Sequence, residues 1–474
     1  MSLRTAAPAS EADRQSTRRN AELGLLVLGW AIGSIALANV VWATGVGITP
    51  RFWLAITVLA ALGLFANIAV RIMAPYAEPI MLPTAYLLNA LGLVMIYRLD
   101  IAESQRAADN GSPEPTPQVF GQLTWTILGV ALLVATLLLV KDHRRLQRYT
   151  YISMVVGVGL LLLPLLPYIG RTVNGATLWI NATPWNTVKP LTFQPAELSK
   201  IALAIFLAGY LVTHRDALAI VMHKWMGMSF PRGRDLGPII VAWLIALAIM
   251  GFETDLGTAL IFFGLFIAML YVATQRRSWL YIGAVMGISG AALAYFVFPH
   301  VRLRVQIWID PFPYATEQGY QIVQSLYGLA NGGILGTGLG QGVPQLVPFA
   351  SNDFILSAFG EELGLTGLIA ILLLYGILVQ RGLRTAAACR DVFGRLLTAG
   401  LAVVLALQVF VVAGGVTKLI PMTGLTTPFL SAGGSALIAN WIMIGLLLRV
   451  SDITRRPDPE VTSPDESLTQ VVRL

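Results

Sequence analysis

The chain has 474 residues, of which 56% are hydrophobic and 12% charged, and its mean hydropathy is +0.71. A soluble globular protein carries about 25% charged residues, so this composition excludes a soluble fold and indicates a membrane protein. The same arithmetic excludes intrinsic disorder and a coiled coil, and the single cysteine, Cys389, excludes a disulfide-stabilised scaffold. The formal net charge of +7 is better explained by membrane topology than by nucleic-acid binding, and we expect no nucleic-acid partner.

Twelve apolar segments are long enough to cross a bilayer as helices, since a hydrocarbon core about 30 Å thick needs around 20 apolar residues. In chain order they lie near 22–42, 53–73, 79–97, 120–140, 149–169, 198–213, 236–252, 256–273, 279–298, 354–379, 396–418 and 430–449. A backbone inside hydrocarbon must satisfy its own hydrogen bonds, and no stretch shows the alternation that a barrel needs. We therefore predict an all-α polytopic membrane protein with about twelve transmembrane helices.

The distribution of positive charge predicts the orientation of these spans. If the N-terminus is cytoplasmic, 23 of the 32 Lys and Arg residues fall in cytoplasmic segments, as the positive-inside rule requires. Both termini are then cytoplasmic, with short polar tails at 1–21 and 451–474. The transmembrane domain between them, 22–450, carries one large extracytoplasmic loop at 299–353.

The extracytoplasmic loops are the most informative part of the sequence. Loops 170–197, 299–353 and 419–430 are rich in Trp, Pro, Gly, Asn and charged residues, whereas most cytoplasmic connections are short and basic. Within the largest loop, 322–350 is weakly apolar and too rich in glycine for a full span. We expect this stretch to dip toward the membrane, return, and line a cleft, because irregular backbone at that depth needs cover from protein or a wet cavity. Any chemistry is therefore expected at the outer face.

Several ionisable residues lie at or near the outer ends of the spans. A charged side chain at the centre of a transmembrane helix costs about 2.5–3.5 kcal/mol on insertion, so each ionisable residue near the membrane is a functional candidate. Taken alone, each is at least as well explained by a structural role as by a functional one. The structural role is either a helix-end charge that reaches water or a salt bridge within the bundle. Together, acids and bases that converge on one side indicate a functional site. The residues are Glu197, Lys200, Glu253, Asp255, Arg302, Arg304, Asp310, Asp353, Glu361, Glu362 and Lys418.

The histidines argue against two kinds of site. His143, His214 and His223 fall on the cytoplasmic side and His300 stands alone outside, so the outer face has no zinc ligand set and no histidine-activated nucleophile. Carboxylates beside cationic groups remain. Such a pair can deprotonate an alcohol while an anionic group leaves, provided that the carboxylate is partly desolvated.

Six ordered motifs between about residues 120 and 450 resemble one known family. The motifs are NGATLWI at 174–180, QPAELSK at 194–200, FETDLGTAL at 252–260, GYQIVQSL at 319–326, NDFILSAFGEELG at 352–364 and PMTGLTTPFLSAGGS at 421–435. On these motifs the chain is similar to the SEDS proteins (shape, elongation, division and sporulation) of the RodA and FtsW type, and most similar to their actinobacterial RodA branch.

The resemblance implies a peptidoglycan glycosyltransferase of the bacterial cytoplasmic membrane. Such an enzyme polymerises lipid II at the outer face for cell-wall elongation or division, releases undecaprenyl pyrophosphate, and works with a class B penicillin-binding transpeptidase. The implied fold is a ten-helix core, here with two further N-terminal spans. No cofactor is implied with certainty, although a divalent cation is compatible with the acidic residues Glu253, Asp255 and Glu361.

The resemblance also implies roles for particular residues. The cations Lys200, Arg302 and Arg304 suit pyrophosphate, since guanidinium groups match phosphate oxygens. Trp179 fits either a sugar ring or lipid stem of the substrate, or an interfacial anchor. The full set of expected substrate-binding residues is Trp179, Lys200, Arg302, Arg304, Gln324, Asp353, Glu361, Lys418 and Ser431.

One departure from the family pattern concerns the catalytic base. The essential aspartate of the family lies five residues before the glycine of the GYQ motif, and that position is Tyr314 here. The nearby carboxylates are Asp310, which precedes Pro311, and Glu317, and we predict Asp310 or, failing that, Glu317 as the base. Two alternatives stay open: a catalytically weakened paralogue that acts as a scaffold for a cell-wall synthase, and a lipid II translocase.

Overall fold

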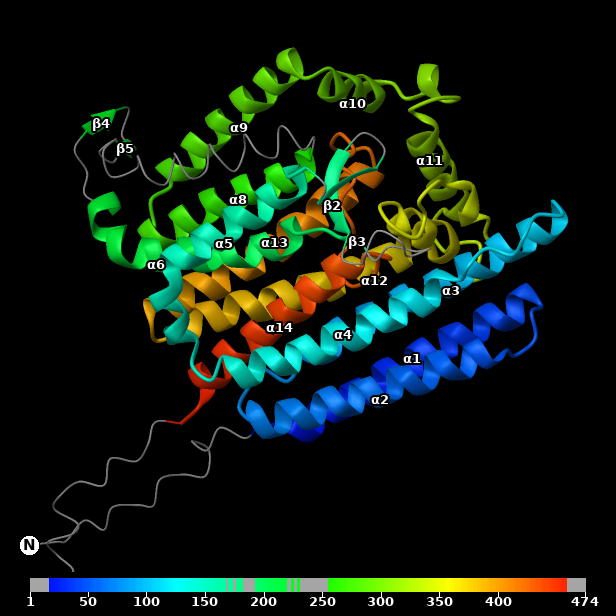
Figure 1. Cartoon of the computed structure of the whole chain (residues 1–474), viewed down its shortest axis with the longest axis horizontal. Coiled ribbons are helices and arrows are strands. Elements are labelled where there is room, and N and C mark those ends of the chain that lie inside the picture. Colours follow the sequence, from blue (N-terminus) through cyan, green and yellow to red (C-terminus); the bar gives the residue numbers. More distant parts are fainter. Residues whose placement is uncertain are drawn as a thin grey trace, which may run out of the picture.

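A computed structural model describes residues 17–167, 169–173, 176–181, 192–219, 223–225, 228–230 and 255–457. Long helices dominate it (Figure 1). They are α1 (Arg19–Thr44), α2 (Pro50–Met73), α3 (Met81–Asp109), α4 (Gln118–Leu139), α5 (Thr150–Leu162), α6 (Ala196–Ala219), α8 (Leu256–Thr274), α9 (Ser278–Val297), α10 (Pro299–Ile309), α11 (Tyr320–Gly332), α12 (Ile355–Ala388), α13 (Val392–Val416) and α14 (Gly434–Arg455).

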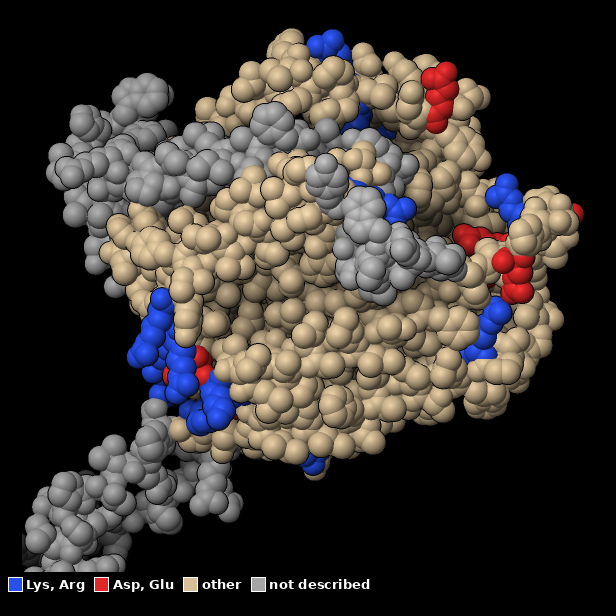
Figure 2. Space-filling view, in the orientation of Figure 1, with Lys and Arg blue, Asp and Glu red and all other residues tan. Residues whose placement is uncertain are grey.

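Eleven helical segments of the described chain are long and apolar enough to cross a membrane. Each coincides with a span predicted from the sequence, and the predicted span at 236–252 lies outside the described residues, as does Glu253. The predicted all-α polytopic membrane fold is confirmed. Figure 2 shows the largest group of visible Lys and Arg at the end of the bundle where α14 ends, in agreement with the positive-inside orientation.

Two small sheets interrupt the helices without changing the fold class. Strands β1 (Gly170–Val173), β2 (Ala176–Asn181) and β3 (Thr192–Phe193) form an antiparallel sheet in the order β1-β2-β3, with Arg171 opposite Trp179. Strands β4 (His223–Trp225) and β5 (Met228–Phe230) form a hairpin. The first sheet belongs to the extracytoplasmic loop 170–197, which the sequence marked as informative but did not predict to contain strands.

The centre of the bundle is formed by helices that are far apart in the sequence. α14 packs along α4, α13 packs against α6, α8 and α12, and α1 packs on α3. In Figure 1, α1 and α2 flank the bundle on one side, and α9 and α10 lie at the opposite edge. Close approach explains one glycine: a Cβ on Gly129 of α4 would lie 2.4 Å from the ring of the fully buried Trp441 on α14.

The glycine-rich segment after α11 is fastened to α12. Backbone N–H groups of Thr337 and Gly338 donate to the carbonyls of Glu361 and Glu362, each at 3.0 Å. Gly336 has φ +85°, and a Cβ there would lie 2.3 Å from the carbonyl oxygen of Glu362, so glycine is required. The segment therefore packs as a tight loop against the outer end of α12, and its glycines serve this close approach.

A buried ion pair secures the same loop. Arg98 Nε of α3 donates to Glu362 Oε1 at 2.9 Å, and both side chains are at most 4% exposed. Arg98 also donates to the carbonyl of Gly342 at 2.7 Å, and the N–H of Gly340 donates to Glu362 Oε2 at 2.9 Å. The hydrogen bonds satisfy charges that would otherwise be very costly to bury. α3, the loop and α12 are thus held as one unit beside the cavity described next.

Candidate functional site

A cavity of about 900 Å³ lies among the outer ends of the helices, the side predicted to be extracytoplasmic. Its walls come from α4, β2, β3, the first turn of α6, the start of α8, α10, α11 and two loops at 349–354 and 415–436. Its polar and aromatic lining includes Trp125, Trp179, Gln194, Glu197, Asp255, Arg304, Trp308, Gln318, Gln321, Asn352, Asp353, Lys418, Thr423 and Ser435.

Hydrogen bonds hold the two lining loops together. The hydroxyl of Ser431 accepts from the N–H of Thr427 at 2.8 Å and donates to the carbonyl of Asn352 at 2.6 Å. The N–H of Ala432 donates to the carbonyl of Ser351 at 2.8 Å. The loops therefore form a continuous wall, and the residues between them have defined positions.

Asp353 is the carboxylate best placed for chemistry in this cavity. Burial raises the pKa of its carboxyl, with Arg304 lowering it and Asp255 raising it further, and the result is about 7. Within the described part of the chain, no group donates a hydrogen bond to either of its oxygens. A carboxylate that is half ionised near neutral pH and has free acceptor oxygens is suited to general-base work.

Asp255 has a different environment in the same cavity. It caps the N-terminus of α8, where its two oxygens accept from the N–H of Thr258 at 2.9 Å and from the Thr258 hydroxyl at 2.6 Å. Burial raises the pKa of its carboxyl, against the effect of these two bonds. Because both oxygens are engaged, Asp255 is better explained as a helix cap that shapes the charge of the cavity.

Two cations line the same cavity as these acids. Arg304 on α10 donates to the carbonyl of Thr423 at 3.2 Å, and burial lowers the pKa of its guanidinium. Lys418 has a left-handed backbone with φ 60°, and its carbonyl accepts from Trp308 Nε1 at 3.1 Å. Strained backbone of this kind concentrates at functional sites. The pair offers two positive charges to an anionic ligand.

Four of the predicted substrate-binding residues line the cavity: Trp179, Arg304, Asp353 and Lys418. Arg302, two residues before Arg304, does not line it; its side chain is exposed and donates to the carbonyl of Phe296 at 3.2 Å. Of the two predicted arginines, Arg304 therefore lines the cavity and Arg302 does not. Residues two positions apart on a helix lie on different faces.

Lys200, Glu361, Ser431 and Gln324 do not line the cavity. Lys200 is buried, where its Nζ lies 2.7 Å from Glu197 Oε2 and donates to Gln408 Oε1 at 2.8 Å. Glu361 accepts from the N–H of Val343 at 2.9 Å and so holds the glycine-rich loop. These two and Ser431 position the walls, and Gln324 on α11 is half-buried outside them.

The two predicted bases lie beside the cavity but not in its lining. Asp310 is exposed just after α10, where it accepts from the N–H of Phe312 at 3.2 Å, and it follows the lining residue Trp308 by two positions. Glu317 is exposed next to the lining residue Gln318. Tyr314, at the position of the expected acid, lies in a short 3-10 turn (Phe312–Tyr314). The assignment of either carboxylate as the base stays a prediction.

Sequence reasoning missed several lining residues. Trp308 lies four positions after Arg304 on α10, and Gln321 is the second residue of α11, two positions after the GYQ glycine. The i, i+4 spacing of Arg304 and Trp308 was a usable signal, since such residues share one face of a helix. Asn352 is the first residue of the motif at 352–364, but the motif alone does not predict which of its side chains line the cavity.

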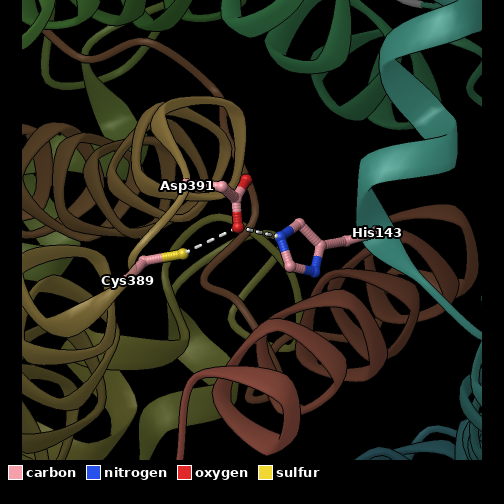
Figure 3. A group of neighbouring side chains, drawn as sticks. All are labelled: His143, Cys389 and Asp391. Atoms are coloured by element: carbon pink, nitrogen blue, oxygen red, sulfur yellow. Dashed lines mark hydrogen bonds and ion pairs between the residues drawn. The ribbon is translucent and has the colours of Figure 1, made fainter. Parts of the chain in front are cut away.

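One group of described residues has the spacing of metal ligands, at the cytoplasmic end of the bundle (Figure 3). The ligand atoms of His143, Cys389 and Asp391 all lie within 4.8 Å of one another. Asp391 already accepts from His143 Nε2 at 2.8 Å, from Cys389 Sγ at 3.4 Å and from the N–H of Gly394 at 2.6 Å, where it caps α13. These bonds explain the group as a brace between the α4–α5 and α12–α13 connections, far from the outer cavity.

The fold and the cavity define a class of protein: a polytopic helical membrane protein with a charged, outward-facing site. A family model described as "Cell cycle protein", for FtsW, RodA and SpoVE, matches residues 79–456, and the chain belongs to this family. The predicted resemblance is confirmed. The match begins after α2, so α1 and α2 are additions to the family core.

Named relatives and solved structures agree with this membership. The chain is 48% identical over 461 residues to the peptidoglycan glycosyltransferase RodA of Mycobacterium tuberculosis, covering 96% of this chain and 95% of the relative. It is 33% identical to a probable peptidoglycan glycosyltransferase FtsW of Geobacter, over 79% and 96% of the two chains.

Among solved structures, RodA of Thermus thermophilus is similar with a TM-score of 0.54 and 26% identity, over 81% and 98% of the two chains. A chain from a peptidoglycan synthase complex that coordinates polymerization and crosslinking is similar with a TM-score of 0.59 and 28% identity, over 77% and 98%.

Proposed function

We propose that this protein is a peptidoglycan glycosyltransferase that polymerises lipid II at the outer face of the bacterial cytoplasmic membrane. The observation that carries the proposal is the outer cavity, in which a partly desolvated carboxylate, Asp353, lies with two cations, Arg304 and Lys418. Relatives at 48% identity over nearly the whole chain carry this enzyme's name.

The chemistry follows from these groups. The carboxylate of Asp353 takes the proton from the hydroxyl of the acceptor sugar. At the same time, the oxygen of that hydroxyl bonds to the anomeric carbon of the donor. The bond from that carbon to the pyrophosphate oxygen breaks, and undecaprenyl pyrophosphate leaves with the bonding electrons. Arg304 and Lys418 offset the negative charge that develops on the leaving group. Trp179 offers a ring to a sugar or to the lipid stem.

Asp353 is our first choice as the base because it lines the cavity, whereas Asp310 and Glu317 lie just outside the lining. Both remain alternatives, since each follows or precedes a lining residue closely. A single assay separates the three. Loss of a general base typically lowers the rate about 10²- to 10⁴-fold.

The partner that fits this activity is a class B penicillin-binding transpeptidase. Support comes from the solved complex of polymerization and crosslinking whose chain is similar to this one. Such a partner joins the strands that the glycosyltransferase produces, so both are expected in the same membrane.

The test is a glycan-ladder gel with labelled lipid II and the purified protein together with its transpeptidase. The variants are Asp353→Asn, Asp310→Asn and Glu317→Gln. The control is Glu114→Gln, which removes an exposed outer carboxylate that lies 3.3 Å from the guanidinium of exposed Arg51. We expect ladders from the parent and the control, and a loss with Asp353→Asn.

Two results would change the conclusion. If Asp353→Asn still produces a ladder, Asp353 is not the base. The base is then Asp310 or Glu317, whichever abolishes the ladder when it is substituted. A parent that makes no ladder, even with its transpeptidase, rejects the polymerase. Tyr314 at the expected acid position would then favour the scaffold, and transport of dye-labelled lipid II across vesicles would favour the translocase.

A further inference from the structure

A second cavity of about 410 Å³ lies beside the first, and Phe349 and Asn352 line both. Its walls are the outer end of α3, the first residue of α4 and the segment 345–352. The volume falls in the range of sites for small molecules, roughly 300–1,000 Å³. Because Asn352 directly precedes Asp353, this second cavity adjoins the carboxylate proposed as the base.

The lining of the second cavity suits a neutral polar ligand. Five of its ten residues have polar side chains, namely Glu103, Gln118, Gln345, Ser351 and Asn352, and none of the ten is Lys or Arg. The first cavity, in contrast, contains the cations Arg304 and Lys418. A pyrophosphate therefore fits the first cavity, and an uncharged ligand rich in hydrogen-bonding groups fits the second.

Gln345 contributes a side-chain amide to the wall of the second cavity. An amide carries both hydrogen-bond donors and an acceptor. A sugar hydroxyl or an N-acetyl group can pair with a group of this kind.

Phe349 stands between the two cavities in a strained conformation. Its φ is 58°, in the left-handed region that bulky residues rarely adopt, and its side chain is 48% exposed. The turn holds it there: its carbonyl accepts from the N–H of Asn352 at 2.9 Å, and the N–H of Ala350 donates to the carbonyl of Val347 at 3.2 Å. Strain maintained by its surroundings at a cavity is typical of a ligand-binding residue.

From these features we infer that the second cavity binds a saccharide unit of the glycan strand, with the ring of Phe349 as its platform and the amide of Gln345 as a hydrogen-bond partner. The apolar face of a sugar packs on an aromatic ring, and its hydroxyl and N-acetyl groups meet the polar walls. The inference rests on the proposed function and extends it: the strand lies in the second cavity and the lipid pyrophosphate in the first.

Binding is tested without any reaction. Saturation-transfer difference NMR uses the purified full chain in detergent micelles and a soluble N-acetylglucosamine tetrasaccharide as the probe. We expect signals from the N-acetyl methyl groups with the parent and with Phe349→Tyr, which keeps the ring. Phe349→Ala and Gln345→Ala should weaken binding about threefold to tenfold, as expected for one lost aromatic or hydrogen-bond contact.

The matched control is Leu346→Ala. Leu346 lies in the same segment and is 46% exposed, but it lines neither cavity. This variant should bind the probe as the parent does. Equal binding by the parent, Phe349→Ala and Gln345→Ala would overturn the inference, and so would an equal loss in Leu346→Ala.

The length of the polymer is the second measurement. In the ladder assay, Phe349→Ala should give shorter chains than the parent and Leu346→Ala, because a strand held less tightly leaves earlier. Saccharide binding that depends on Phe349 in a parent that makes no polymer would support this site and reject the proposed function. A polymerising parent whose saccharide binding and chain length do not depend on Phe349 would reject the site and leave the function standing.

Discussion

The pKa of Asp353 makes a prediction about the pH dependence of polymerisation. A general base works in its ionised form, so kcat/KM should rise with pH and level off above the pKa of the free enzyme's base, about 7. One pH unit below that value about a tenth of the carboxyl groups are ionised, so the rate should be about tenfold below the plateau.

Two neighbours of Asp353 should move this midpoint in opposite directions. Arg304 lowers the pKa of Asp353 and Asp255 raises it. Arg304→Gln should therefore shift the midpoint to higher pH, and Asp255→Asn should shift it to lower pH, each by on the order of one unit. One unit corresponds to about 1.4 kcal/mol of differential interaction between the two protonation states.

The assay is the initial rate of labelled lipid II polymerisation across pH at low substrate concentration. Arg302→Gln is the control. It also removes one positive charge, but Arg302 lies two residues before Arg304 and its side chain is exposed outside the cavity. Arg304→Gln should also lower the plateau, because it removes a phosphate partner, but the midpoint is independent of that loss. A common midpoint in all four proteins, or an acid shift in Arg304→Gln, would refute the assignment of Asp353.

Three further predictions concern stability, measured as thermal unfolding of the purified protein in detergent. Glu362→Gln should cost about 3–5 kcal/mol, because it leaves Arg98 buried without its counter-charge, whereas the double variant Arg98→Met, Glu362→Leu should cost less than either single change. A loss in the double variant equal to the sum of the two single losses would show that the pair is not coupled. Gly336→Ala should destabilise more than Gly333→Ala: both have positive φ, which disfavours alanine, but only the Cβ at Gly336 would meet backbone, at 2.3 Å. Asp391→Ala should cost about 2–4 kcal/mol, since it removes a helix cap and leaves a buried histidine without its hydrogen-bond partner; a chelator should leave the parent's melting temperature unchanged, and a fall in that temperature would indicate a bound metal ion in place of a brace.

The sequence by itself determined the positions of the spans, the side of the site and the family. Hydropathy locates the spans because a bilayer requires about 20 apolar residues in a self-bonded helix, and positive charge orients them. The motifs near Gly319, Asp353 and Ser431 placed the chain in its family. Each of these properties is local, so it is legible without knowledge of what lies opposite a residue.

The tertiary structure decided which charged residues share the cavity. Lys200 pairs with Glu197 and donates to Gln408, and Glu361 binds the glycine-rich loop. Asp353, Arg304 and Lys418, in contrast, line the outer cavity. The sequence could not separate these two groups, because helix packing decides whether a charged side chain meets a buried partner or faces the cavity; Gln408, which accepts from Lys200, lies 208 residues away in the sequence. The desolvation of Asp353 is likewise set by tertiary packing. The pKa of Asp353 depends on burial and on Arg304 and Asp255, which lie outside the motif at 352–364.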